Sequence, residues 1–351
     1  MVNNLLTIVL VIILSLFVVL SLLFLFMLVT KRMQNRMRQQ IEQQKEKLRA
    51  SVFDYLYRQN SVILEQNWNG HQWKAMEELF KDFADVVQGE EVQEKITLFA
   101  ETHFSDVYKR NLLKHRWSIR MNCLYAVEDF HMKGMVPFLL STFQKRKLSQ
   151  EERRQLLKIL VRLHTNQWEE FLKEPNWRLS EFMYRSLFGV MTEEQFQVMV
   201  TRFEELPEYI QLPVLDMIGI DGKREYLSFL EDLLIPSIGE KKIRILKALN
   251  ELGYSKILDR MGKLHTRESA WEERLMISKL LGKTNRKESL SFLTELLSDP
   301  NFDVRNNAAK SIIAIDGGEE YLRQVQETST DRFARDMAEE WLLKGGKVHG
   351  L

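Results

Sequence analysis

Apolar segments with helical spacing recur about every 30 residues through most of this chain. From residue 91 onward they alternate with polar turns, and every second segment ends at a comparable landmark. These ends lie near Phe130, His164, Val190, Ile218, Leu252, Leu281, Ile315 and Leu343. A unit of this length holds two short helices and two turns, and successive hairpins must stack because one hairpin cannot bury its apolar side alone. The spacing predicts an all-α fold, an α-α superhelix of helical hairpins, over residues 68–351.

The clearest hairpin lies near the C-terminal end of the chain. Its first helix is expected over Ser289–Leu297 and stops at Pro300, because proline cannot continue the hydrogen-bond ladder. Asp303 is the expected N-cap of the second helix, Val304–Ile315. Gly317 can adopt the left-handed conformation that lets the chain turn back.

The run from Ser298 to Ala309, followed by Ile315-Asp316-Gly317, resembles a HEAT repeat, and most closely the short bacterial kind named after phycobilisome-lyase subunits. The resemblance covers about 230 residues and is clearest over 220–345. It implies that Asp303 and Arg305 connect neighbouring repeats. It also implies a scaffold with a concave partner-binding surface, but no activity, because a fold does not fix a function.

Residues 1–30 carry no charged side chain, and 21 of the 25 residues from Leu5 to Val29 are Leu, Ile, Val or Phe. As a helix this run is about 38 Å long, enough to cross a hydrocarbon core of about 30 Å. A cleaved signal peptide would need a basic start and a shorter apolar run. Residues 1–30 are therefore predicted to be a transmembrane anchor.

The basic residues nearest to this segment all follow it. Residues 31–50 contain seven Lys or Arg and two Glu, a net charge of +5, and no Lys or Arg precedes the span. The positive-inside rule predicts a single-pass protein of the cell membrane with its N-terminus outside and all later residues in the cytoplasm. Lipid contact is expected from Lys31, Arg32, Arg36 and Arg38. The alternative is that they serve only as a topology signal.

Residues 31–67 are predicted to form a basic stalk helix that continues from the membrane. Apolar residues recur every seven positions at Ile41, Leu48, Tyr55 and Val62, but the partnering positions of a coiled-coil seam are polar. Two interpretations stay open. The stalk is either an exposed spacer helix or a self-association helix that makes the protein a homo-oligomer.

No catalytic or cofactor-binding motif is present in the sequence. Gly282-Lys283-Thr284 resembles the end of a phosphate loop but lacks the earlier glycine of that motif. None of the seven histidines is followed by Glu, as the His-Glu pairs of HEAT-like di-iron hydroxylases would require. Cys123, the one cysteine, is expected to be buried and inert. We therefore predict no catalytic residue, no metal, no cofactor and no enzymatic activity.

Basic residues gather in two neighbouring hairpins. Arg116 and Arg120 belong to one, and Arg154, Lys158 and Arg162 share one helix face in the next. We call these five residues the basic ridge and expect it to bind a partner. The alternative is a solvated face neutralised by neighbouring glutamates. Nucleic acid is excluded as a ligand, because outside residues 31–50 the chain has 43 basic and 47 acidic side chains.

These features predict a membrane-anchored cytoplasmic scaffold or adaptor that binds a protein through its repeat surface. The partner is expected to be a membrane enzyme such as a glycosyltransferase, or a transporter. The alternative is an enzyme or a chromophore-lyase-type accessory subunit, as in the lyases that named the repeat.

Overall fold

The computed structural model describes residues 2–58, 68–86, 89–144, 146–165, 167–264 and 269–348. Within these ranges the chain is helical and contains no β-strand, which confirms the all-α prediction. The chain divides into two compact units, unit 1 (Met1–Thr165) and unit 2 (Asn166–Leu351).

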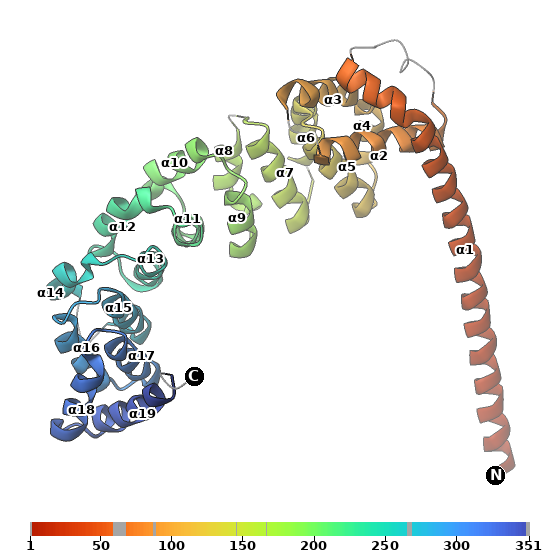
Figure 1. Cartoon of the computed structure of the whole chain (residues 1–351). Coiled ribbons are helices and arrows are strands. Elements are labelled where there is room, and N and C mark those ends of the chain that lie inside the picture. Colours follow the sequence, from red (N-terminus) through yellow and green to blue (C-terminus); the bar gives the residue numbers. More distant parts are fainter. Residues whose placement is uncertain are drawn as a thin grey trace. The chain divides into compact units, whose positions relative to one another are not determined.

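Unit 1 begins with a single long helix followed by shorter ones (Figure 1). Its helices are α1 (Val2–Arg58), α2 (Gly70–Val86), α3 (Glu90–His103), α4 (Ser105–Leu112), α5 (Trp117–Asp129), α6 (Val136–Phe143) and α7 (Gln150–Arg162).

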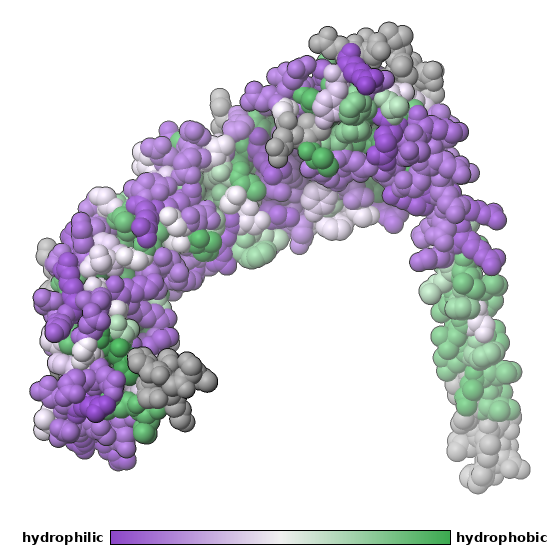
Figure 2. All heavy atoms as spheres, in the orientation of Figure 1, coloured by the Kyte–Doolittle hydropathy of each residue, from purple (hydrophilic) through white to green (hydrophobic). Residues whose placement is uncertain are grey.

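The first half of α1 is an apolar rod that contacts no other described element. The described side chains of residues 10, 11 and 13–29 are exposed, among them Phe17 and Phe26, at 67% and 68% of their full accessible area. Figure 2 shows this apolar stretch giving way to hydrophilic surface farther along the helix. By length and composition, α1 can cross a membrane, although a signal sequence would have the same properties.

The second half of α1 packs on α2, so the exposed-spacer interpretation of the stalk is wrong there. Val52 and Leu56 are fully buried, and Tyr55 packs edge-on against Phe99 of α3. Lys45 is 6% exposed, and its ammonium lies 2.8 Å from a carboxylate oxygen of Asp82. Ile41, Leu48 and Tyr55 are half-buried within the chain. Residues 59–67, including Val62, lie outside the described residues.

Unit 2 is a row of helical hairpins. Its helices are α8 (Trp168–Lys173), α9 (Glu181–Phe188), α10 (Glu193–Thr201), α11 (Glu208–Ile220), α12 (Leu227–Leu234), α13 (Gly239–Glu251), α14 (Met261–Leu264), α15 (Trp271–Lys283), α16 (Ser289–Leu297), α17 (Phe302–Ile313), α18 (Gly318–Thr328) and α19 (Arg332–Val348). The second helices of the hairpins contact one another in the order α9, α11, α13, α15, α17, α19. Within this unit they form the inner side of a curve (Figure 1).

Small residues let the second helices of unit 2 approach closely. A Cβ atom added at Gly219 of α11 would lie 2.9 Å from the Cα of Ala248 on α13. One added at Gly282 of α15 would lie 2.6 Å from the Cβ of Ser311 on α17. The Ser311 hydroxyl also donates to the Ser278 carbonyl of α15 across 2.8 Å. These contacts hold successive repeats in register.

The helix ends confirm the predicted repeat. Seven of the eight landmarks fall within two residues of the end of a second helix, and Leu343 lies inside α19. After most of these helices one residue has a positive φ and reverses the chain. These residues are His131, His164, Gly222, Gly253, Asn285 and Gly317. Histidine and asparagine thus occupy a left-handed position that glycine fills elsewhere.

Two expectations for the clearest repeat are wrong. The N-cap of α17 is Asn301, whose side-chain oxygen accepts from the backbone N–H groups of Asp303 and Val304, while Asp303 itself is exposed. Asp299 makes the ion pair between repeats, with its two carboxylate oxygens 2.5 and 3.0 Å from the Arg274 guanidinium of α15. Arg305 donates to the carbonyls of Asp299 and Pro300 within its own repeat. Its guanidinium also lies 4.6 Å from the ring centroid of Phe333 on α19, so the expected contact of Arg305 with the next repeat is present.

Candidate interaction surface

Two residues of the basic ridge, Lys158 and Arg162 of α7, neutralise a buried carboxylate. Glu128 of α5 is 2% exposed, and its Oε1 lies 2.9 Å from Lys158 Nζ and 2.8 Å from an Arg162 guanidinium nitrogen. The amide of Gln155, also on α7, donates to the other oxygen. Because an unpaired buried charge is costly, both cations are structural parts of the α5–α7 contact.

Arg120 is also engaged in an inter-helix contact. Its Nε lies 2.7 Å from Glu152 of α7, and the same guanidinium donates to the carbonyls of Lys114 and His115. Glu152 also completes the capping box with Ser149 that starts α7. Arg120 therefore ties the start of α7 to α5.

The remaining ridge residues, Arg116 and Arg154, differ from these three. Arg116 is exposed just before α5, and Arg154 is half-exposed on α7. Neither forms an ion pair within the described residues. The structure thus brings acidic partners to Arg120, Lys158 and Arg162 and leaves two separate cations, rather than a continuous free ridge.

A groove of about 810 Å³ lies in unit 1 between α3 and the turns that follow α5 and α7. Its charges are mixed. Glu90, Glu94 and Glu101 face His131, Lys133, Arg162 and His164. Burial, together with the positive charge of Arg162, lowers the pKa of His131. This balance favours no single sign of ligand charge.

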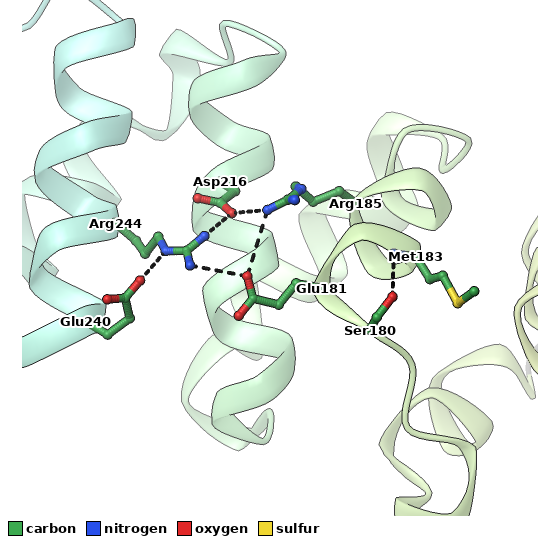
Figure 3. Close-up of polar contacts among 7 residues, drawn as sticks. All are labelled: Ser180, Glu181, Met183, Arg185, Asp216, Glu240 and Arg244. Atoms are coloured by element: carbon green, nitrogen blue, oxygen red, sulfur yellow. Dashed lines mark hydrogen bonds and ion pairs between the residues drawn. The ribbon is translucent and has the colours of Figure 1, made fainter. Parts of the chain in front are cut away.

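In unit 2, an ion-pair network connects the first two turns of α9 and of α13 with the middle of α11 (Figure 3). Asp216 of α11 is 5% exposed and lies between Arg185 of α9, at 2.8 Å, and Arg244 of α13. Arg244 also reaches Glu181 and Glu240, at 3.2 and 2.6 Å. Every charge in the network has a partner of opposite sign, so the network serves to hold three repeats together.

A groove in unit 2 differs in composition from the groove of unit 1. It crosses α13, α15 and α17, measures about 250 Å³, and contains no acidic residue. Its lining comprises Asn250, Lys279, Gly282, Lys283, Asn307, Lys310, Ser311 and Ala314. We call it the lysine groove. Lys279 and Lys310 have no carboxylate within 4 Å in the described part of the chain.

Sequence reasoning did not find the lysine groove. The available signal was the spacing of Lys247, Lys279 and Lys310, which are 32 and 31 residues apart and so stay in phase with the repeat. Lys247 is exposed on α13, one turn before Asn250. Equivalent positions of three successive second helices therefore carry a lysine. The basic ridge was predicted because its residues are close to one another in the sequence, and lysines that lie one repeat apart cannot be found in that way.

Cys123 is buried at 4% exposure, as expected, and burial raises the pKa of its thiol to about 11. Over the described ranges, no cluster of three or more His, Cys, Asp or Glu side chains has a geometry that could hold a metal ion.

A family model supports the repeat architecture of the last hairpins. Residues 258–342 match the family model described as HEAT repeats. A crystal structure of an engineered protein aligns over 88% of this chain and 99% of its own, with 13% identity and a TM-score of 0.37. The comparison with curated proteins found no match. The last hairpins of unit 2 are therefore similar to HEAT repeats, within an all-α chain.

Proposed function

We propose that this chain is a non-catalytic scaffold, anchored in the cell membrane by α1, whose helical repeats bind a protein partner at the cytoplasmic face. The observation that carries the proposal is the continuity of α1. One helix joins an exposed apolar rod to a segment that is packed into unit 1.

The basic segment after the apolar rod fits this arrangement. Lys31, Arg32 and Arg36 are exposed, whereas Arg38 forms an ion pair with Glu78 of α2 at 2.8 Å. Contact with α2 thus starts at Arg38, about 14 Å beyond the apolar rod, and burial starts at Lys45, about 24 Å beyond it. Unit 1 is thereby attached to the bilayer surface by a rigid helix.

Membrane insertion and orientation can be tested with single-cysteine variants. In a Cys123→Ser background, Asn3→Cys places a thiol before the span and Gln34→Cys places one after it. We expect an impermeant maleimide to label Asn3→Cys in intact cells and to label Gln34→Cys only after permeabilisation. Release of the protein by alkaline carbonate, or the opposite labelling pattern, would refute the anchor and its orientation.

Partner binding can be tested with a photo-crosslinking residue placed in unit 2 of the membrane-embedded chain. Position Ala314 directly follows α17 and lines the lysine groove, and Lys256 lies in the short 3-10 turn before α14 as a matched exposed control. We expect a discrete protein adduct from position 314 and none from 256. Membrane enzymes such as glycosyltransferases, and transporters, are the first candidates for its identity. No adduct from either position would count against the scaffold.

A further inference from the structure

The lysine groove concentrates positive charge that the chain does not neutralise. In the network of Figure 3, each cation on the neighbouring helices has a carboxylate partner. Farther along the same row of helices, Lys279 and Lys310 line a shared groove without one. Lys283 is also present, and its ammonium donates to the Asn250 carbonyl. An external anion is the complement of such a site.

The polar floor of the groove indicates what kind of anion fits. The Asn250 side-chain oxygen is buried and has no hydrogen-bond partner among the described residues. A buried acceptor needs a donor, because leaving it unpaired costs free energy. A peptide supplies backbone N–H donors together with carboxylates along one extended chain, whereas a phosphate group itself carries no N–H.

The spacing of the lysines sets the spacing of the ligand charges. Packed helices lie about 8–10 Å apart, and small residues such as Gly282 and Ser311 permit this approach. A polyproline II strand rises about 9 Å per three-residue turn and presents every third side chain on one face. An extended strand that crosses α13, α15 and α17 can thus pair successive carboxylates with Lys247, Lys279 and Lys310.

We propose that the lysine groove, extended by Lys247, binds an extended acidic segment of the partner with a carboxylate at every third residue. The proposal rests on the proposed function in that the partner is a protein, and it adds the chemistry by which that protein is recognised.

The test uses the full chain in nanodiscs of zwitterionic phosphatidylcholine and a fluorescent peptide of four Glu-Pro-Ala triplets. Binding is followed by fluorescence anisotropy. We expect the affinity to fall severalfold as salt rises from about 50 mM to about 300 mM, because exposed charges are screened. A peptide of identical composition with its glutamates in one block should bind at least tenfold more weakly. Equal binding of the two peptides would overturn the spacing argument.

Two double variants separate the groove from general surface charge. Lys279→Glu/Lys310→Glu should weaken peptide binding at least tenfold, whereas Lys256→Glu/Lys287→Glu makes the same charge change at exposed positions outside the groove and should leave it within twofold. An unchanged melting temperature shows that both variants fold. Equal effects of the two variants would overturn the proposal.

A lipid target is distinguished by flotation of the nanodiscs with phosphatidylserine vesicles. We expect no dependence of flotation on the groove lysines. Dependence there, without peptide binding, would assign the groove to lipid and overturn the proposal. Adducts from position 314 without peptide binding would overturn this inference and leave the scaffold standing.

Discussion

Charge removal at Lys158 and Arg162 should destabilise unit 1 in a strongly pH-dependent manner. The variant Lys158→Met/Arg162→Met keeps the side-chain bulk but leaves Glu128, at 2% exposure, with the neutral Gln155 amide as its hydrogen-bond partner. An uncompensated buried charge costs about 3–5 kcal/mol. The loss is limited because the carboxyl can take up a proton.

The free-energy cost of protonating the carboxyl therefore sets the upper limit of the stability loss. For a glutamate in water, with a pKa of about 4.3, adding the proton costs about 3.7 kcal/mol at pH 7 and about 1 kcal/mol at pH 5. We therefore expect the double variant to lose about 3–4 kcal/mol at pH 7 and about 1 kcal/mol at pH 5. Stability relative to wild type should fall as pH rises, because the variant's native state holds a proton that its unfolded state releases.

Cys123 lies one and a half turns before Glu128 on α5 and provides a local probe. Its labelling by 4,4′-dithiodipyridine, which also reacts at acidic pH, reports opening of this region in the detergent-solubilised full chain. We expect the ratio of variant to wild-type labelling rates to be roughly 10²–10³ at pH 7 and about tenfold or less at pH 5.

Glu128→Gln supplies the control. Added to the double variant, it removes the buried charge and should restore most of the stability and abolish the pH dependence. In the wild-type background it should cost only about 1 kcal/mol, because Lys158 and Arg162 are partly exposed and can be hydrated. Equal losses at both pH values, or no rescue by Glu128→Gln, would refute the reasoning.

Three further outcomes are expected. Gly219→Ala should destabilise unit 2 by about 1–3 kcal/mol, measured by urea unfolding and circular dichroism, because the added Cβ meets the Ala248 backbone. Gly189→Ala, whose added Cβ has contacts no closer than 3.6 Å, should be nearly neutral, and equal effects of the two variants would refute the close-contact argument. Because burial lowers the pKa of His131, the contribution of this side chain to unit 1 stability should be present above about pH 6.5 and be lost as pH falls below that value. His131→Asn should weaken this pH dependence of the melting temperature, and an identical pH profile in the variant would contradict the prediction. Native Cys123, with a thiol pKa of about 11, should react with iodoacetamide at pH 8 far more slowly than the urea-unfolded chain, and equal rates would contradict its burial.

The structure changes how the predicted basic ridge can be tested. Arg120, Lys158 and Arg162 were recognised from charge and helical spacing, and both properties are present. Reversing Lys158 and Arg162 would nevertheless unfold the α5–α7 contact, so loss of partner binding in such a variant would say nothing about a binding surface. Arg116 and Arg154 remain suitable for that test.

Local patterns in the sequence were sufficient to predict the helices, the repeat of about 30 residues and the uncharged N-terminal segment. Each depends on neighbours within one or two helical turns, where apolar spacing and turn residues act directly. Tertiary structure decided which α1 residues pack on α2, that Asp299 rather than Asp303 pairs with a neighbouring repeat, and which lysines have no carboxylate partner among the described residues. Those outcomes depend on distances between residues about 30 positions apart, such as Glu128 and Lys158, and only the packing of successive repeats fixes such distances.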